Sequence, residues 1–495
     1  MTTTFHSHNP ATGSTNPGLF RAAPPDEVDT ACLLAEEAFR WMIGRRNTDR
    51  AALLDAMAAN ILALGEELLT TAGAETGLAV PRLQGERDRT VFTLRALGQL
   101  VRVGRWVRAE IDRADPARKP LPKPDLRRML RPLGPVAVFG ASNFPLAYST
   151  AGGDTASALA AGCPVVVKGH PSHPATSQMV AEAVIAAVRD TNFHHGTFQH
   201  LPAGGDRELA IGQELVTHPA IKAVGFTGSF RGGTALARLA ASRPEPIPVF
   251  AEMGSINPIF ILPGALAAEA ESIAEKIIGA VTNSNGQMCT CPGLVFIVRG
   301  DGANRFLDTL VSRAAATPAQ PMLSARVRAG FLERLHEVSQ VPGVEQAARG
   351  QPAAGSGTSQ PVVVLRASLS SLHRFPTLRE ECFGPSTILV ECDEELDLLK
   401  GAEALPGSLV GAIFAAPTDR AGALAQILAG KVGRLVFNGV TTGVEVSAAM
   451  VHGGPWPATN QPQSTAVGAM AVERWCRPVC WQNASPELLP EELRG

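Results

Sequence analysis

The sequence has no large excess of charge of either sign. Its 44 Lys and Arg residues nearly balance its 46 Asp and Glu residues, which leaves a net charge of -2 over 495 residues. Surfaces that bind nucleic acid or acidic lipid are usually strongly basic, so neither partner is expected. A small basic cluster at Arg127, Arg128 and Arg131 flanks a proline-rich connector and is interpreted as a solvated segment.

Export and membrane-crossing segments are also lacking. The longest uncharged stretch, 135–153, contains Pro145 and several glycines, which makes a lipid-exposed helix unfavourable. The first residues show neither the basic region nor the apolar core of a signal peptide. The 8 cysteines have no zinc-ribbon spacing, so we expect reduced thiols, no metal and a cytoplasmic location.

The sequence contains no internal repeat. A chain of this length is too long for one ordinary hydrophobic core, so two or three domains are expected. From residue 135 onward, short apolar runs alternate with helical patterns. Strands are expected at 136–139, 165–167, 198–201, 221–226 and 249–253, and helices at 150–161, 175–188, 207–215 and 234–241. This alternation predicts an open parallel sheet with helices on both faces.

The segments around this region have their own patterns. Two amphipathic helices are expected before it, over 28–42 and 53–68. A second α/β region is expected from residue 252 to about 437, with a loop at 351–361. The charged, proline-rich segment 114–131 predicts a connector or an excursion to another subunit, and 472–482 predicts an edge or exchanged strand.

The residue that carries most chemical information is Cys289. Asn285, Gly286 and Gln287 predict a tight turn that exposes this thiol. A deprotonated thiol can attack a carbonyl carbon, and an ordinary cysteine titrates near a pKa of ~8.5. An isolated cysteine is more often a core residue, but the Gly-Gln-Met-Cys-Thr context favours a nucleophile. Cys291 has no second ligand pair for a metal and is interpreted as a pocket residue.

A carboxylate is predicted at the carboxyl end of a strand. Glu252 follows the apolar run 248–250 and precedes Gly254. Ligands of open parallel sheets bind at that edge. Without Cys289 in view, Glu252 is equally consistent with an ordinary solvent-exposed carboxylate at the end of a strand. Together with Cys289 it predicts a general base that activates water against a thioester.

Two further motifs suit an oxidoreductase. Asn143, directly after the strand at 136–139, can donate to a developing oxyanion together with the Cys289 backbone N–H, although an Asx-turn before a proline is a simpler reading. The run 226–233 closes a strand and opens a helix whose N-terminus favours pyrophosphate. The run 226–233 does not match the G-x-G-x-x-G pattern of many dinucleotide-binding loops. Lys168, at another strand end, can reach ribose hydroxyls or a phosphate.

Taken together, these motifs resemble the aldehyde dehydrogenase superfamily over nearly the whole chain. The most specific runs are Phe-Thr-Gly-Ser at 226–229, Glu-Met-Gly at 252–254, Gly-Gln-Met-Cys at 286–289 and Glu-Glu-Cys-Phe-Gly-Pro at 380–385. The resemblance implies that Cys289 is the nucleophile, Glu252 the general base and Asn143 the oxyanion donor. It also implies a cofactor, NADP or NAD, held at its riboses, nicotinamide and pyrophosphate by Lys168, Glu381, Phe383, Gly228, Ser229 and Gly233.

The sequence resembles in particular the α-ketoglutaric semialdehyde (2,5-dioxopentanoate) dehydrogenases and NADP-dependent fatty aldehyde dehydrogenases. Runs that carry this likeness include 121–129, 140–147, 151–159, 444–446 and His-Gly-Gly-Pro at 452–455. The implied reaction converts α-ketoglutaric semialdehyde to 2-oxoglutarate through a cysteine thioester. A medium- or long-chain aliphatic aldehyde is the alternative substrate. A cysteine acyl hydrolase and a non-catalytic dinucleotide-binding protein are the alternatives from other classes.

Some positions depart from the superfamily pattern. Ser142 stands where many members have tryptophan, and Cys291 replaces a small or polar residue. Pro171 falls where NAD-preferring members often carry a glutamate. Without that acid, a ribose 2′-phosphate meets no like charge, and it can be received by His170, His173 or Thr176. We therefore expect that the protein accepts NADP and that it can prefer NADP over NAD.

The resemblance also implies the fold: two doubly wound parallel-sheet α/β domains plus a small oligomerisation element. Residues 1–113 and 132–251 are assigned to the dinucleotide-binding domain and 252–437 to the catalytic domain. Segments 114–131 and 472–495 are assigned to oligomerisation, and 438–471 to the substrate channel. A homodimer or homotetramer is the expected assembly.

A semialdehyde that bears a carboxylate needs a cation in its channel. Arg95, or another arginine of the helical region 87–108, is the candidate, although these arginines also suit a solvated helix face. Tyr148 and Trp456 are expected to line the channel or to serve packing alone.

Overall fold

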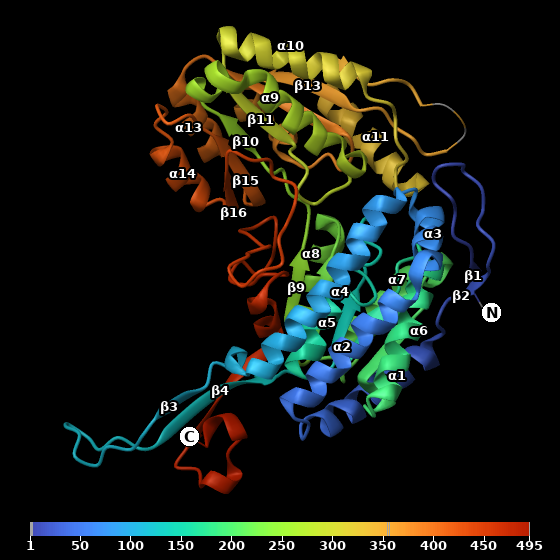
Figure 1. Cartoon of the computed structure of the whole chain (residues 1–495), viewed down its shortest axis with the longest axis vertical. Coiled ribbons are helices and arrows are strands. Elements are labelled where there is room, and N and C mark those ends of the chain that lie inside the picture. Colours follow the sequence, from blue (N-terminus) through green and yellow to red (C-terminus); the bar gives the residue numbers. More distant parts are fainter. Residues whose placement is uncertain (1–2, 354, 356, 495) are drawn as a thin grey trace.

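The computed structural model describes residues 3–353, 355 and 357–494. Its lower body in Figure 1 contains a parallel five-stranded sheet of order β7-β6-β5-β8-β9. The strands are β5 (Val136–Phe139), β6 (Val165–Lys168), β7 (Phe198–Leu201), β8 (Ala223–Thr227) and β9 (Val249–Glu252). The chain starts in the middle at β5, moves outward through β6 and β7, and continues on the other side of β5 at β8.

Helices cover both faces of this sheet because alternate side chains of a strand point in opposite directions. Val136 and Val138 of β5 pack in one core with α2 (Asn47–Ala63), α3 (Gly65–Thr76), α4 (Val80–Val103), α5 (Gly153–Ala161) and α6 (Pro174–Asp190). Ala137 and Phe139 pack in a second core with α1 (Pro25–Met42), α7 (Glu208–Thr217) and α8 (Phe230–Ala241).

The upper body in Figure 1 is built around a seven-stranded sheet of order β12-β13-β14-β11-β10-β15-β16. All its neighbouring strands are parallel except β12 and β13. The strands are β10 (Ile259–Ile261), β11 (Leu294–Val298), β12 (Glu345–Arg349), β13 (Val363–Ser368), β14 (Ser386–Cys392), β15 (Ser408–Phe414) and β16 (Val432–Phe437).

This second sheet is also covered on both faces. One core contains α9 (Pro263–Thr282) and α10 (Asp301–Ala316). The other contains α11 (Ala325–Ser339), α12 (Leu369–Arg374), α13 (Glu395–Ala404) and α14 (Gly422–Ala429). The predicted fold class, two doubly wound α/β domains with a smaller added element, is confirmed. Among the helices that the structure describes, none is long and apolar enough to cross a bilayer.

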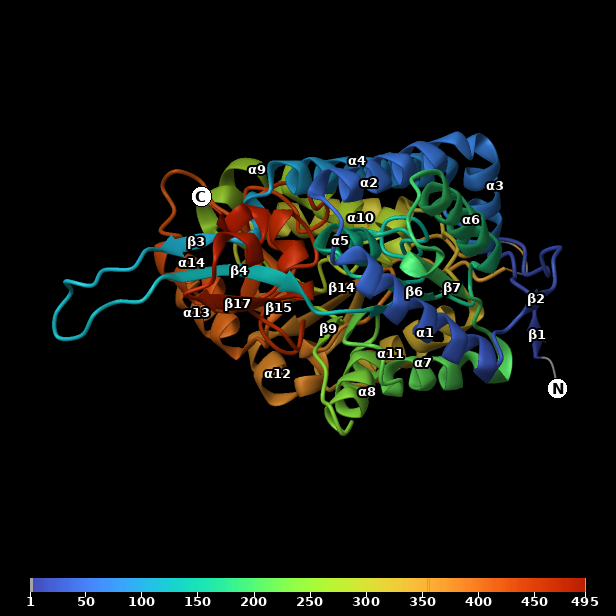
Figure 2. The ribbon, with the colours of Figure 1, turned by 90° about the horizontal axis from the view of Figure 1, so that it is seen from below.

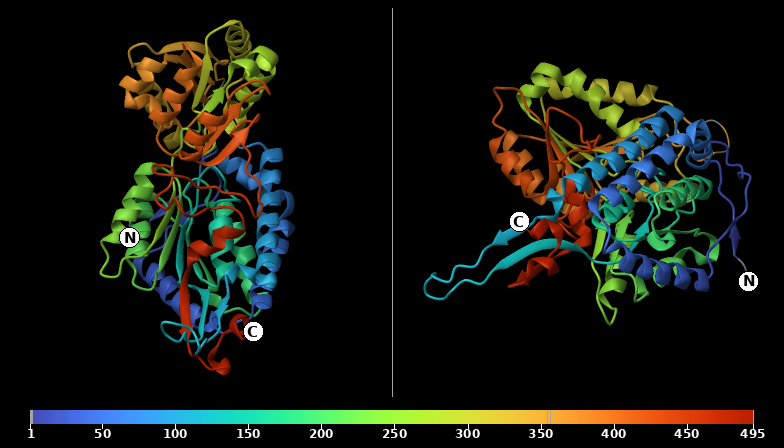
Figure 3. Two further views of the ribbon diagram at one scale, coloured as in Figure 1. Left: turned by 90° about the vertical axis from the view of Figure 1, so that its left-hand side faces the viewer. Right: turned by 60° about the horizontal axis from the view of Figure 1, so that its bottom comes forward.

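The smaller element is an antiparallel sheet of order β17-β4-β3. Its strands are β3 (Glu110–Asp112), β4 (Leu126–Pro132) and β17 (Cys476–Gln482). The connection between β3 and β4 reaches well beyond the rest of the chain in Figures 2 and 3. A short pair, β1 (Thr4–Phe5) with β2 (Phe20–Arg21), lies near the N-terminus.

Three predicted elements differ from the structure. The helix expected over 53–68 is two helices, because Gly65 adopts a φ of 58° that a continuous helix does not allow. The connector expected at 114–131 contains most of β4, which pairs with β17. The strand expected from residue 472 begins only at Cys476, since a 3₁₀ helix over Ala469–Trp475 buries Trp475 instead. The loop expected at 351–361 includes 354 and 356, which lie outside the described residues.

Candidate active site

A large cavity lies at the carboxyl ends of β5, β6, β8 and β9. In a sheet of this order the connections after β5 and β8 leave on opposite sides, which opens a crevice between them. The cavity has a volume of about 1510 Å³. Its walls include residues that follow these strands, residues 323–334 around the start of α11, and Phe383 before β14. The cavity is therefore bordered by both α/β bodies.

The thiol of Cys289 reaches this cavity from a strained turn. Ser284, Asn285 and Gly286 have φ angles of 50°, 52° and 69°, all in the left-handed region. Asn285 is held there because its amide donates to the Gln320 carbonyl at 2.7 Å. A side chain at residue 286 would come within 2.1 Å of a backbone oxygen, so only glycine fits. The predicted turn before the thiol is confirmed.

Asn257 fixes the same loop from the other side. Its amide donates to the carbonyls of Cys289 at 2.8 Å and Cys291 at 2.9 Å. Asn257 is fully buried and has a φ of 49°. These bonds fix the backbone on both sides of Thr290, so the thiol is held in position by a residue that the sequence motifs did not single out.

Cys289 and Glu252 border the cavity, and His452 lies close to both of them. One ligand-type atom from each of them lies within 4.8 Å of the other two. His452 Nε2 is 3.7 Å from Cys289 Sγ and 3.0 Å from Glu252 Oε1. Glu252 is buried, and its oxygens accept no hydrogen bond from any other described residue. A thiol, an imidazole and a carboxylate in this order can transfer a proton away from sulfur.

His452 reaches this position because the segment that follows it lies beside β9. Residues 452–460 run beside β9, where Glu252 forms an antiparallel bridge with Thr459 and the Met253 N–H donates to the Ala458 carbonyl at 2.8 Å. The backbone N–H of His452 donates to the Thr465 hydroxyl at 2.8 Å. His452 belongs to the run 452–455 noted in the sequence, but nothing in that run indicated its distance from Cys289.

Electrostatics at the thiol oppose its ionisation. Burial raises the pKa of Cys289 well above its ordinary value, and the carboxylates of Glu252 and Glu381 raise it further. Arg89 acts in the opposite direction and lowers the pKa. The surroundings of the thiol therefore favour its protonated, neutral form. A base in contact with sulfur is needed.

Asn143 lies next to the thiol loop. It is buried, and its side-chain amide donates to the Gln287 carbonyl at 3.0 Å. Arg82 donates to the Asn143 carbonyl at 2.9 Å and holds its backbone. An amide carries two N–H groups, so one remains for a ligand beside the thiol.

The same cavity contains most of the residues expected to bind a dinucleotide. The lining includes Lys168, His170, Gly228, Ser229, Glu381 and Phe383. Ser229 caps α8 by accepting from the Gly232 N–H at 3.2 Å. Burial lowers the pKa of Lys168, and burial raises the pKa of Glu381 to about 7. A cation, a helix N-terminus and a carboxylate spread along one cleft suit the phosphates and riboses of NAD(P).

Three expected cofactor residues lie elsewhere. Gly233 lies on α8 and does not border the cavity, and a side chain there would come within 2.7 Å of Met253. His173 is fully buried and bonded to Ser177 and the Ala141 carbonyl. Thr176 is fully buried and donates to Glu75. Of the residues proposed for a 2′-phosphate, only His170 borders the cavity, together with Pro171.

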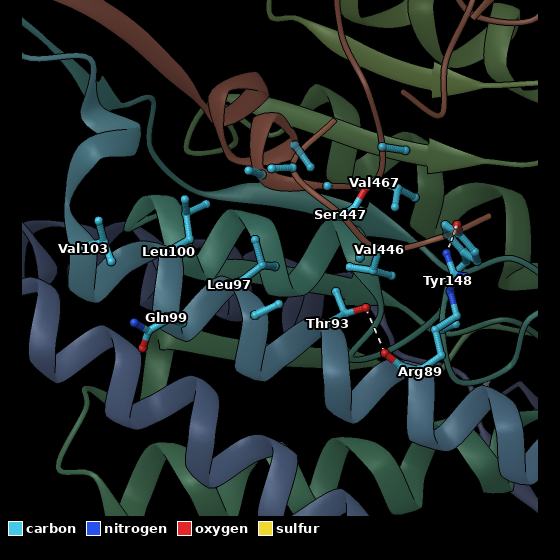
Figure 4. A pocket seen from close by; sticks show the side chains of 18 residues that line it. Arg89, Thr93, Leu97, Gln99, Leu100, Val103, Tyr148, Val446, Ser447 and Val467 are labelled. Carbon is cyan, nitrogen blue, oxygen red and sulfur yellow. Dashed lines mark hydrogen bonds between the residues drawn. The ribbon is translucent and has the colours of Figure 1, made fainter. Parts of the chain in front are cut away.

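The three expected substrate residues are also separated. Tyr148 lies in a second pocket of about 310 Å³, shown in Figure 4, and its ring centroid is 6.2 Å from that of His452. Arg95 is exposed and borders neither cavity. Trp456 is 55% exposed and packs edge-on against Phe230. Arg89, six positions before Arg95 on α4, is the arginine that reaches Tyr148.

Comparisons with known proteins agree with this geometry. Residues 1–456 match the model of the Aldehyde dehydrogenase family. The chain is 46% identical to Alpha-ketoglutaric semialdehyde dehydrogenase 2 of Azospirillum brasilense, and 44% identical to Alpha-ketoglutaric semialdehyde dehydrogenase of Acinetobacter baylyi. Each alignment covers 96% of this chain and 90% of the relative.

Solved structures show the same fold. An aldehyde dehydrogenase of Bacillus cereus superposes with a TM-score of 0.82 at 22% identity, covering 97% of this chain and 93% of that protein. An NAD+ complex of aldehyde dehydrogenase from the same organism gives a TM-score of 0.81. The family match, the two relatives and the shared fold together place this chain in the aldehyde dehydrogenase family.

Proposed function

We propose that this protein oxidises α-ketoglutaric semialdehyde to 2-oxoglutarate with NADP or NAD, through a thioester on Cys289. One observation carries the proposal: thiol, imidazole and carboxylate lie within 4.8 Å of one another beside a large cavity whose lining suits a dinucleotide. The two relatives with nearly half of their residues identical are named for this substrate.

The first step is deprotonation of Cys289. Because burial raises the pKa of this thiol, spontaneous ionisation is unfavourable. His452 Nε2, 3.7 Å from sulfur, accepts the proton as sulfur attacks the aldehyde carbon. The imidazolium that forms is paired with the Glu252 carboxylate at 3.0 Å, which compensates its burial.

Attack converts the aldehyde oxygen to an oxyanion in a thiohemiacetal. The free N–H of the Asn143 amide and the backbone N–H of Cys289 are the proposed donors to that oxygen. Bound NAD(P)+ supplies the acceptor for the hydride that the thiohemiacetal carbon loses, and a thioester remains on Cys289. The loop bonds from Asn257 keep sulfur fixed while the oxyanion forms.

Glu252 is the proposed base for hydrolysis. Its carboxylate lies close to the sulfur and has no donor other than His452. It takes a proton from water as the water oxygen attacks the thioester carbonyl. The C–S bond then breaks, which releases the carboxylate product and returns the thiolate.

Lys168, Ser229, Glu381 and Phe383 are proposed to hold the cofactor along the cavity. NADP is the proposed preference, because Pro171 and His170 border the cavity near Lys168 and no acid stands at residue 171. Arg326 also borders the cavity, and its positive charge lowers the pKa of both Lys168 and His170. A 2′-phosphate there meets Lys168 and Arg326, although Arg326 is paired with Glu208 at 3.4 Å.

We also propose a cytoplasmic homodimer or homotetramer in which the β17-β4-β3 sheet contacts a second copy. The connection between β3 and β4 extends beyond both bodies in Figure 2, and it includes Leu121, which is 68% exposed. The 8 cysteines are all free, in keeping with a reducing compartment.

The direct test is to mix the protein with α-ketoglutaric semialdehyde and NADP or NAD and to follow the absorbance of the reduced nicotinamide. Oxidation that disappears in Cys289→Ser supports the proposal. Consumption of a thioester without any cofactor, and no cofactor reduction with any aldehyde, would instead support a cysteine acyl hydrolase.

A further inference from the structure

Two arginines near the thiol have no acidic partner. Arg89 on α4 and Arg434 on β16 are both half-buried. Neither pairs with an Asp or Glu in the described part of the chain. Some other half-buried or buried arginines do, as Arg474 does with Asp154 at 2.7 Å and Arg366 with Glu391 at 2.8 Å. Arg89 and Arg434 therefore have no carboxylate of the described chain to neutralise their charge.

Both guanidinium groups bind one loop, residues 441–444. Arg434 donates to the carbonyls of Thr441 and Gly443, and Arg89 donates to the carbonyl of Val444. The Thr441 hydroxyl in turn donates to the Thr290 carbonyl at 2.7 Å, directly after Cys289. This loop brings both cations to the side of the thiol.

The electrostatic interactions of the two arginines with the thiol agree with this placement. Arg89 lowers the pKa of Cys289. Burial lowers the pKa of Arg434, whereas Cys289 and Tyr148 raise it. The carboxylates of Glu252 and Glu381 also act on the thiol and would repel an anionic substrate. The two arginines compensate that repulsion.

Arg89 also closes one end of the second pocket. In Figure 4 its side chain extends from α4 to Tyr148, whose hydroxyl accepts a hydrogen bond at 3.2 Å. Tyr148 in turn lies beside His452. Beyond Arg89 the pocket wall is mainly apolar, and Figure 4 shows Leu97, Leu100, Val446 and Val467 around it. Arg89 and Tyr148 thus stand between the thiol and an apolar pocket.

We propose that Arg89 and Arg434 form a carboxylate clamp, which binds the distal carboxylate of a short aldehyde substrate while its aldehyde carbon is at Cys289. A guanidinium has five N–H donors, and each of these two arginines uses two, so each keeps donors for a carboxylate. The clamp rests on the proposed function, because it is the part of the proposed site that binds the carboxylate end of the semialdehyde.

The positive charge of the clamp favours aldehydes that carry a carboxylate over uncharged aldehydes. A five-carbon semialdehyde ends at Arg89 and does not enter the apolar pocket. An aliphatic aldehyde of the same length leaves two guanidinium groups without an anion and gains little from them. Loss of a hydrogen-bonded charge pair weakens binding by roughly ten- to a hundredfold.

The test compares 5-oxopentanoate with pentanal, which have equal chain length and differ in the carboxylate. KM and kcat are measured with saturating NADP for the wild type, Arg89→Met, Arg89→Lys and Arg434→Met. Arg420→Met, an exposed arginine outside both cavities, is the matched control for lost charge. Arg95→Met tests the other arginine of α4.

We expect Arg89→Met and Arg434→Met each to raise KM for 5-oxopentanoate by roughly ten- to a hundredfold and to change KM for pentanal less than about threefold. Arg89→Lys should recover part of the loss, and Arg420→Met should change neither value. Equal effects on both aldehydes, no effect of either clamp variant, or an effect at Arg95 in place of Arg89 would overturn the clamp. A wild type that oxidises neither aldehyde would overturn the proposed function instead.

Discussion

The Nε2 atom of His452 lies 3.0 Å from the carboxylate of Glu252, and both side chains are buried. The same ring nitrogen lies 3.7 Å from the Cys289 sulfur. His452 therefore connects the thiol, which starts the reaction, with the carboxylate that is proposed to end it. We propose that this link allows a thiol whose pKa is raised by burial to act near neutral pH.

His452→Phe should slow formation of the thioester. Phenylalanine keeps the ring volume but removes the proton acceptor, and loss of a general base typically costs about 10²- to 10⁴-fold. The first turnover, measured by rapid mixing, should slow by that factor, and alkylation of Cys289 by iodoacetamide at pH 7 should slow with it. Unchanged first-turnover and alkylation rates would show that His452 has no such role.

Glu252→Gln should affect the later step. Glutamine is isosteric but cannot take a proton from water, so the thioester should form and then persist. We expect a burst of one NADPH per active site followed by slow turnover, with the acyl group on Cys289 detectable by mass spectrometry. Steady turnover at the wild-type rate would remove the assignment of Glu252 as base.

Asn143→Ala should lower kcat by roughly a hundredfold or more, because one donor to the oxyanion is lost. KM for the cofactor should stay close to the wild-type value, since the Asn143 amide bonds to the Gln287 carbonyl rather than to a cofactor residue. Asn143→Asp, which keeps the size but reverses donor to acceptor, should be at least as slow. A fully active alanine variant would favour the Asx-turn reading.

Cofactor binding should depend on Glu381 and on pH. Burial raises the pKa of Glu381 to about 7, so its carboxyl is neutral below that pH and ionised above it. Ribose hydroxyls donate to the ionised form, and binding should tighten as the pH rises from 6 to 8. Calorimetry in buffers of different ionisation enthalpy should detect proton release on binding near pH 6. Glu381→Gln should bind more weakly at pH 8 and lose this pH dependence.

Pro171→Glu should shift cofactor preference from NADP to NAD. A carboxylate at residue 171 would repel a 2′-phosphate in the cavity and can accept a hydrogen bond from the ribose hydroxyls of NAD. The ratio of kcat/KM for NADP to that for NAD should fall by about tenfold or more. Pro171→Gln has the same length without the charge and should produce a much smaller change.

Much of the fold followed from local pattern. Strand β5 occurs at the predicted residues, 136–139. The prediction was possible because a short apolar run ends at a glycine and a helix of small residues follows. The left-handed turn before Cys289 was also expected, since Asn285 and Gly286 tolerate positive φ. The break at Gly65 was missed because the apolar spacing continues across it.

The candidate site was predictable only where a residue follows a strand or turn. Glu252 and Lys168 end β9 and β6, so the sheet places them at the ligand-binding edge. Arg95 and Arg89 look alike in sequence, and only helix orientation directs Arg89 to Tyr148 and leaves Arg95 in solvent. Gly233 looked like a cofactor residue, yet it packs against Met253.

The sequence by itself determined the thiol, the base, the amide and the alternating strands and helices, because each depends on residue type and short-range spacing. Tertiary structure decided what these residues touch. His452, Arg89 and Arg434 come from a return segment, a helix and a strand far from Cys289 in the chain, and their meeting depends on packing between elements. Burial, which also arises only in the folded chain, set the pKa of Cys289 and Glu381.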